Sequence, residues 1–331
     1  MAEKMMEYRS LGRTGVRVSP ICLGTAFRSQ EDEEVCVRVV EHAIDRGCNF
    51  IDTALYGEGR SEKVVGRAIK GRRDNVVLTT KIFKTLGENP NTDRLNRLNI
   101  MSGIEASLRR LGTDYIDLYL LHTFDKDTPL DETLRALDDL VRQGKVRYIG
   151  CSNFVAWKMV EALWISGEKG LASFVCTQSQ YNLLNRVEVE PDLMPLCKQF
   201  GIGIMAYSPL AIGLLTGRFR RGQTPPEGTP WSIGENTGLS PHKYNIEDAL
   251  DEFNDRIIET LVGVSRRYDM TPAQVAIAWI LDHDEISAPI VGADLPEHVD
   301  EVIEGLKWSL PGEERTLLDQ VSDRPVLRKY S

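Results

Sequence analysis

Short runs of apolar residues alternate with longer amphipathic segments along this chain. Near-continuous apolar stretches of this length are typical of parallel β-strands that are buried on both faces. Eight of them occupy residues 21–23, 49–51, 76–80, 116–121, 146–151, 174–177, 202–206 and 288–291. The pattern therefore predicts eight strands, each followed by a segment long enough for a helix.

The segments between the runs carry helical signals. Within residues 33–46, apolar side chains recur at the spacing that places them on one face of a helix. A helix start is predicted at Thr271, which can act as N-cap, because Pro272 follows in the first turn and Gln274 can close a capping box. Strands and helices thus alternate along the chain.

This alternation predicts right-handed crossovers and a parallel sheet. Eight units favour a closed (β/α)8 TIM barrel over an open sheet, and no G-x-G-x-x-G follows an early strand, which weakens a Rossmann alternative. Residues 8–18 contain two Gly turn signals and predict an N-terminal β-hairpin. Residues 209–250, after strand seven, have no clear period and predict a long loop. We interpret 1–331 as a single α/β barrel domain.

Composition and charge narrow the functional classes. The net charge of −9 argues against a nucleic-acid partner, which requires clustered Lys and Arg. No stretch approaches the roughly 20 apolar residues that span a membrane. The charged N-terminus is unlike a signal peptide. Six scattered cysteines without a C-x-x-C pair are interpreted as reduced packing residues of a cytoplasmic protein, and five histidines without metal-ligand spacing predict no metal site.

Polar residues and one glycine follow the predicted strands, at the barrel end where active sites lie. They are Asp52, Lys81, His122, Ser152, Asn153, Gln178, Tyr207, Ser208 and Gly292. A lone histidine there is usually structural and a lone lysine is usually solvated. The combination of Asp, Lys and His with the nearby Tyr56 indicates chemistry instead.

These residue types suit the interconversion of a carbonyl compound and an alcohol. A tyrosine has a reference pKa of about 10, too high for ready proton transfer near neutrality. A lysine ammonium beside it favours the phenolate by at most about 4 kcal/mol at 4 Å and an effective dielectric near 20. Asp52 is expected to hold Lys81, and His122 to orient the substrate carbonyl. The site then needs a hydride carrier, which no side chain supplies, while acyl transfer is disfavoured because no nucleophile elbow occurs.

Several segments together resemble the aldo/keto reductases over nearly the whole chain. They are residues 47–57, which include Asp-Thr-Ala-Leu-Tyr-Gly, Lys81, residues 117–122, 144–154, 180–184, 207–210 and 213–217. The resemblance implies a catalytic tetrad of Asp52, Tyr56, Lys81 and His122. It also implies an NAD(P)(H)-dependent oxidoreductase that interconverts an aldehyde or ketone, including a sugar or aryl aldehyde, and its alcohol.

In such enzymes the cofactor lies extended across the barrel mouth. Ser152, Asn153 and Gln178 would hold the nicotinamide carboxamide, and Tyr207 would stack on the ring. The phosphates would lie against the segment that begins at Ser208, and the adenosine end against residues 292–301. The full set of expected cofactor contacts is Gly24, Thr25, Asp52, Ser152, Asn153, Gln178, Tyr207, Ser208, Pro209, Leu210, Gly213, Leu215, Gly292, Asp294, His298 and Glu301.

Two departures from the family pattern matter. Asp52 and Tyr56 are one residue closer than usual, so either the turn tightens and keeps both side chains, or the site is altered. Asp294 stands where related sequences carry a cation or small polar residues for a 2′-phosphate. Asp294 can instead accept hydrogen bonds from a ribose 2′-hydroxyl or simply cap the next helix, with His298, or Arg266 or Arg267, still available to a phosphate. NAD(H) and NADP(H) therefore both remain candidates.

The remaining aromatic and histidine residues carry weaker expectations. Phe27, Phe124 and Trp231 either cover the core or line a substrate pocket together with Tyr56 and His122. Trp157 is expected to pack against the barrel, and His242 and His283 to lie on the surface.

Two functions remain in competition. The expected partner of the enzyme is a small-molecule carbonyl compound or alcohol. The rival is a cofactor-binding regulatory barrel with little turnover, resembling potassium-channel beta subunits, and the shortened turn is the feature that favours it.

Overall fold

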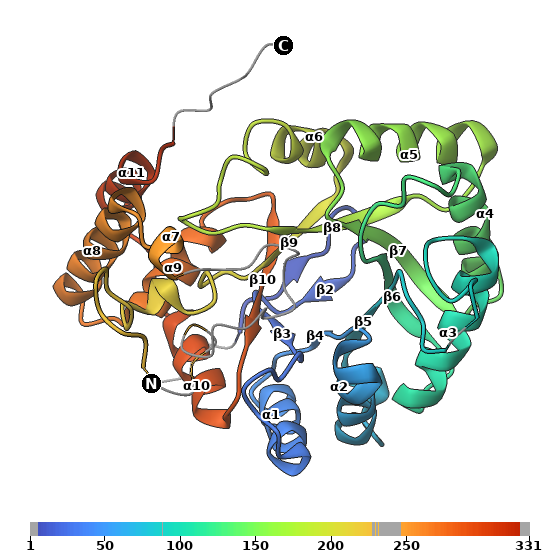
Figure 1. The fold of residues 1–331 in the computed structure, drawn as a ribbon, viewed down its shortest axis with the longest axis horizontal. Coiled ribbons are helices and arrows are strands. Elements are labelled where there is room, and N and C mark those ends of the chain that lie inside the picture. The colour runs from blue at the N-terminus through green and yellow to red at the C-terminus, as the bar shows by residue number, and fades with distance from the viewer. Residues whose placement is uncertain (1–5, 88, 227–228, 230, 232–245, 325–331) are drawn as a thin grey trace.

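A computed structural model describes residues 6–87, 89–226, 229, 231 and 246–324, and Figure 1 shows its central barrel surrounded by helices. Eight strands close in the order β10-β3-β4-β5-β6-β7-β8-β9, and every neighbouring pair is parallel. The predicted (β/α)8 barrel is confirmed. Its strands are β3 (Cys22–Gly24), β4 (Phe50–Asp52), β5 (Val77–Ile82), β6 (Ile116–Leu121), β7 (Val146–Ser152), β8 (Phe174–Gln180), β9 (Gly203–Tyr207) and β10 (Ile286–Gly292).

The helices pack outside the strands, where they cover the apolar outer face of the sheet (Figure 1). They are α1 (Glu33–Asp45), α2 (Tyr56–Ala68), α3 (Arg97–Leu111), α4 (Leu130–Arg142), α5 (Ala156–Lys169), α6 (Leu193–Phe200), α7 (Ile246–Ala249), α8 (Glu252–Arg267), α9 (Pro272–Leu281), α10 (Pro296–Gly305) and α11 (Gly312–Val321). The predicted capping box is present at α9, where Thr271 and Gln274 each bond the other's backbone N–H. Two 3-10 helices, η1 (Arg73–Asn75) and η2 (Leu214–Thr216), complete the described helices.

The N-terminal hairpin closes one end of the barrel. β1 (Arg9–Ser10) and β2 (Arg17–Val18) pair in antiparallel fashion, as predicted. Leu11 and Val18 are fully buried against the inward-facing side chains of the strands. Because the hairpin fills the end where the strands begin, the open end is the one where they finish.

The cysteines are unpaired packing residues, as predicted. All six cysteines are free and buried. Within the described part of the chain, no helix is both long and apolar enough to span a bilayer.

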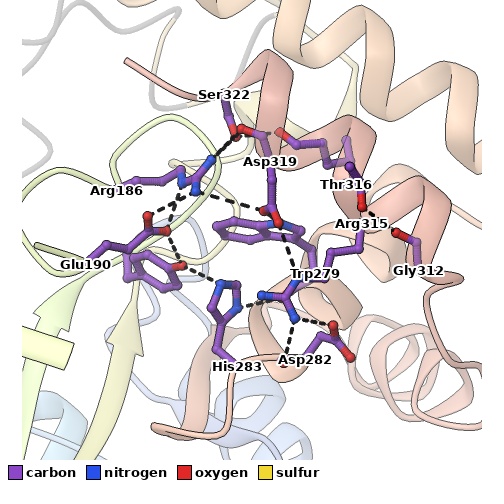
Figure 2. A network of polar contacts seen from close by, with 12 residues as sticks. Arg186, Glu190, Trp279, Asp282, His283, Gly312, Arg315, Thr316, Asp319 and Ser322 are labelled. Atoms are coloured by element: carbon purple, nitrogen blue, oxygen red, sulfur yellow. Dashed lines mark hydrogen bonds and ion pairs between the residues drawn. The ribbon is translucent and has the colours of Figure 1, made fainter. Parts of the chain in front are cut away.

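A polar network fastens α11 to α9 and to the segment after β8 (Figure 2). Arg186 bonds Glu190 on one side and the Ser322 hydroxyl on the other, at 2.8 and 2.7 Å. The indole N–H of Trp279 donates to Asp319 at 2.8 Å. These contacts join segments that lie far apart in the sequence.

The expected surface position of His283 is wrong. Its Nε2 lies 3.1 Å from the Tyr181 hydroxyl and its Nδ1 lies 3.0 Å from the Trp279 carbonyl, at the edge of the network in Figure 2. The side chain is buried because the turn after α9 points inward toward Tyr181. His242 lies outside the described residues.

The expected packing of Trp157 against the barrel is also wrong, because its side chain is 65% exposed. The face of α5 that contacts the core carries Met159, Ala162 and Ser166. Trp157 precedes Met159 by two positions and therefore points to the opposite side of the helix. In the predicted loop 209–250, the structure describes η2 and α7, and most of residues 227–245 lie outside its description.

Candidate active site

A buried ion pair lies at the mouth of the barrel. The Lys81 ammonium, on β5, bonds both carboxylate oxygens of Asp52, at 2.7 and 2.6 Å, and the Thr53 carbonyl at 2.9 Å. Both side chains are almost fully buried. Burial alone would lower the pKa of Lys81, but Asp52 and then Tyr56 outweigh it, so the pKa is raised and the ammonium stays charged.

The carboxylate of Asp52 is also fixed from the far side of the barrel. Gln178, on β8, donates from Nε2 to Asp52 Oδ1 at 2.9 Å. The Thr25 hydroxyl bonds the Asp52 carbonyl at 2.8 Å and lies 2.8 Å from the Ser61 hydroxyl. The resemblance assigns Gln178 and Thr25 to the cofactor. In the structure they also fix Asp52, Gln178 through its carboxylate and Thr25 through its backbone carbonyl.

Tyr56 stands next to this pair despite the short turn. Its ring centre is 5.5 Å from the Lys81 Nζ. Of the two alternatives for the short turn, the structure keeps both Asp52 and Tyr56 beside Lys81. Directly after Tyr56, the residues Gly57, Glu58 and Gly59 all have left-handed backbone with φ of 56°, 54° and 87°.

His122 faces Tyr56 from the end of β6. The two rings meet edge to face with centres 6.0 Å apart. Burial, and then the positive charges of Lys81 and Arg28, lower the pKa of His122 to about 3. The imidazole is therefore neutral near pH 7 and can donate a hydrogen bond without carrying a charge.

The residues expected around the nicotinamide also lie together. Asn153 follows β7 with a left-handed φ of 59° and donates to the Ser152 hydroxyl and the His122 carbonyl at 3.1 and 3.0 Å. The Tyr207 hydroxyl donates to Asn153 Oδ1 at 2.9 Å. One hydrogen-bonded chain thus connects the ends of β6, β7 and β9.

The segment 208–213 after β9 fits a phosphate-bearing group. Ser208, Ala211 and Ile212 have left-handed backbone with φ of 51°, 49° and 56°. Among the described residues, no acceptor takes the backbone N–H of Leu210 or of Ile212. Backbone N–H groups gathered by such conformations form anion-binding concavities. Pro209, Gly213 and Leu215, also expected to contact the cofactor, belong to the same turn-rich stretch.

Asp294 follows β10 and does not cap the next helix. Leu295 is the N-cap of α10, and no side-chain cap bond is present there. Burial raises the pKa of the Asp294 carboxyl, partly offset by His298, whose Nδ1 accepts from the Asp294 N–H at 3.4 Å. Arg267 is paired with Glu314 at 2.5 Å and is engaged elsewhere.

Three other residues expected to contact the cofactor lie against neighbouring parts of the protein. The Glu301 carbonyl accepts from Gln274 Nε2 at 2.7 Å. Gly24 ends β3 directly beside Gly292, the last residue of β10. Both glycines lie at the barrel mouth.

The three expected pocket aromatics are packed against protein. Phe27 is buried in the core that surrounds the barrel, and Trp231 is buried with its indole N–H bonded to the Ile212 carbonyl at 2.9 Å. Phe124 is half-buried and meets Phe154 edge to face at 5.4 Å. Of the three, Phe124 retains the most free surface.

The sequence analysis missed two arginines at the mouth. Arg28, one residue after Phe27, places its guanidinium carbon 5.7 Å from the centre of the Tyr56 ring. Arg60, on α2, bonds carbonyl groups of the same loop. The sequence feature that could have identified Arg28 is its position, a cationic residue in the loop directly after the first barrel strand.

The barrel and its polar mouth define the class of protein, a (β/α)8 barrel built around a tyrosine, lysine, aspartate and histidine. A profile of the aldo/keto reductase family matches residues 20–323. The chain belongs to the aldo/keto reductase family.

Relatives in this family carry two kinds of name. The chain is 35% identical to a Bacillus subtilis protein named as the uncharacterized oxidoreductase YrpG, over 97% of each chain. It is 34% identical to a probable voltage-gated potassium channel subunit beta of Oryza sativa, over 91% of each. A putative subunit of the same name from Schizosaccharomyces pombe is 36% identical over 92% of this chain and 89% of its own.

Proposed function

We propose that this protein is an NAD(P)(H)-dependent oxidoreductase that interconverts an aldehyde or ketone and its alcohol, with Tyr56 as general acid and base. The observation that carries the proposal is the buried Asp52–Lys81 pair beside Tyr56, with neutral His122 opposite. A buried ion pair is a weak source of stability, and its placement under a tyrosine at the open mouth favours a chemical role.

In the direction of reduction, the Tyr56 hydroxyl gives its proton to the substrate carbonyl oxygen. The Lys81 ammonium stabilises the resulting phenolate through charge, because its three protons are taken by Asp52 and Thr53. Neutral His122 donates a hydrogen bond to the same carbonyl oxygen and fixes its orientation. In the direction of oxidation, the phenolate takes the proton back from the alcohol.

The nicotinamide cofactor supplies the hydride when bound. Ser152, Asn153 and Gln178 would hold its carboxamide, Tyr207 would stack on the ring, and the free N–H groups of segment 208–213 would receive its phosphates. Asp294, His298 and Glu301 would lie at the adenosine end. A small-molecule carbonyl compound or alcohol would then occupy the space between Tyr56, His122 and Phe124. The free, buried cysteines support a reducing, cytoplasmic setting.

The test is oxidation of reduced cofactor at 340 nm against a panel of sugar, aryl and aliphatic aldehydes, with NADH and NADPH compared. Cofactor fluorescence measures binding separately. Saturable, aldehyde-dependent oxidation supports the proposal.

A second candidate function is favoured by the relatives named as potassium channel beta subunits. It is a barrel that binds the cofactor and turns over little. Tight cofactor binding with no oxidation across the whole panel would support this candidate and contradict the first.

A further inference from the structure

Arg28 lies directly over the proposed proton donor. It belongs to the loop between β3 and α1, and its guanidinium carbon is 5.7 Å from the centre of the Tyr56 ring. The preceding residue, Phe27, has a left-handed φ of 44°, a conformation that costs energy in any residue with a side chain. Strained backbone of this kind tends to occur where it aims a functional side chain.

The loop that carries Arg28 is held from two sides. Arg60, four residues after Tyr56, donates to the Phe27 carbonyl at 3.5 Å, the Gln30 carbonyl at 2.8 Å and the Glu31 carbonyl at 2.9 Å. The Gln30 side chain reaches the Asp294 carbonyl on the other side, at 3.4 Å. The backbone position of Arg28 is therefore set by the fold.

Arg28 has no acidic partner. In the part of the chain that the structure describes, no carboxylate forms an ion pair with it and no hydrogen bond satisfies its guanidinium. Its neighbour Arg60 shows the contrast, with three carbonyls and Glu33 at 3.6 Å. Desolvation lowers the pKa of Arg28, opposed only by Tyr56, yet an arginine at this position remains charged.

Among the described charged groups around Tyr56, one cation has no counter-ion. Asp52 and Lys81 neutralise each other, and His122 is uncharged near pH 7. Arg28 is therefore the cation beside Tyr56 that no described carboxylate neutralises, and its side chain is exposed to solvent. A planar cation with free donors at an open site is suited to bidentate binding of a carboxylate or phosphate.

We propose that Arg28 binds an anionic group on the substrate, so that the carbonyl compounds used by this site are acidic, such as oxo acids or phosphorylated aldehydes. This inference rests on the proposed carbonyl chemistry at Tyr56. The alternative source of the same chemistry is a phosphate of the cofactor. The position beside Tyr56 and His122, rather than beside segment 208–213, favours the substrate.

The experiment compares two aldehydes that differ in charge, 4-carboxybenzaldehyde and its uncharged methyl ester. kcat/KM is measured for wild type, Arg28→Gln, Arg28→Lys and the control Arg38→Gln, which removes one exposed positive charge from α1. Cofactor Kd is measured by fluorescence for each variant, and thermal unfolding checks the fold.

The expected result is a preference of wild type for the acid. Arg28→Gln should lower kcat/KM for the acid by about 10- to 100-fold, the size of a hydrogen bond to a charged group, and change the ester by less than about 3-fold. Arg28→Lys should recover part of the loss, because lysine keeps the positive charge but lacks the paired N–H donors of the guanidinium. Arg38→Gln should change neither substrate.

Three results would overturn the inference. The first is that wild type shows no preference for the acid. The second is that Arg28→Gln lowers kcat/KM equally for both aldehydes. The third is a rise in cofactor Kd in Arg28→Gln that accounts for the loss of kcat/KM, which would identify a cofactor phosphate as the anion. If wild type reduces neither aldehyde, the proposed carbonyl chemistry is decided separately, by the full aldehyde panel. Benzoate binding to the cofactor-loaded protein then decides the role of Arg28, which is supported if Arg28→Gln abolishes it and contradicted if it does not.

Discussion

At the scale of single residues, burial decides the charge of His122. A histidine with its ordinary pKa would be partly protonated near neutrality and would add a positive charge to the mouth. Burial, reinforced by Lys81 and Arg28, lowers this pKa to about 3 and keeps the ring neutral. The same shift has a consequence for the stability of the fold.

The unfolded chain protonates His122 near pH 6.5, whereas the folded chain does not until about pH 3. The unfolded state therefore binds more protons in this window, and stability falls as the pH drops below 6.5, by at most about 1.4 kcal/mol per pH unit. Urea unfolding of wild type and His122→Gln at pH 7.5 and 5.0 measures the difference. We expect wild type to lose about 1–2 kcal/mol more than the variant. Equal losses would mean that His122 is not held neutral by the fold.

At the scale of elements, the turn from β4 into α2 continues into a left-handed stretch at residues 57–59. Gly57 and Gly59 adopt this backbone without strain, but Glu58 adopts it with φ of 54° and an exposed side chain. Replacing Glu58 by Gly should raise the free energy of unfolding by about 0.5–1 kcal/mol. Glu58→Ala is the matched control and should not raise the free energy of unfolding, because the alanine Cβ strains a left-handed backbone as much as that of glutamate. An equal effect of both substitutions would contradict the left-handed assignment.

The pairing of β4 with β5 brings Asp52 and Lys81 together, and this contact was expected from the adjacency of the two strands. Lys81→Met leaves a buried carboxylate without its cation, which typically costs about 3–5 kcal/mol. The double variant Asp52→Asn/Lys81→Met should recover much of that stability in a thermal melt. Both variants should lose turnover, because the phenolate of Tyr56 is no longer stabilised. A double variant as unstable as Lys81→Met would show that the pair is not the source of the loss.

At the scale of the whole molecule, the proposed cofactor path runs across the mouth from Ser152 to Asp294. On that path Asp294 would repel a 2′-phosphate, and the adjacent residues 292–298 contain no Lys or Arg. We expect weak discrimination in favour of NADP(H), and Asp294→Arg should shift the ratio of kcat/KM toward NADPH by about 10-fold or more. If wild type already prefers NADPH by a hundredfold and the variant does not improve it, Asp294 has no part in cofactor choice.

Features with a local cause could be predicted from the sequence. The eight apolar runs mark the strands because burial on both faces demands apolar side chains at nearly every position. The Thr271 capping box and the N-terminal hairpin depend on residues a few positions apart. The grouping of Asp52, Lys81, His122 and Gln178 at one end could also be predicted, because the strand ends converge in a closed barrel.

Features that depend on distant contacts could not be predicted. His283 is buried because it hydrogen-bonds Tyr181, which lies 102 residues away in the sequence. The exposed side of Trp157 depends on which face of α5 meets the barrel. The direction of Arg28 follows from the left-handed Phe27 and the bonds of Arg60, neither of which has a signature in the loop's own sequence.

The central claim is that Tyr56 passes a proton while a hydride moves from the cofactor to a carbonyl carbon. The most direct measurement is a single turnover with reduced cofactor that carries deuterium at the transferable position, with mass analysis of the alcohol. We predict one deuterium on the former carbonyl carbon for each cofactor oxidised, and a rate about 10²–10⁴-fold lower in Tyr56→Phe with cofactor binding unchanged. Label that stays on the bound cofactor in wild type, or an undiminished rate in Tyr56→Phe, would contradict the account.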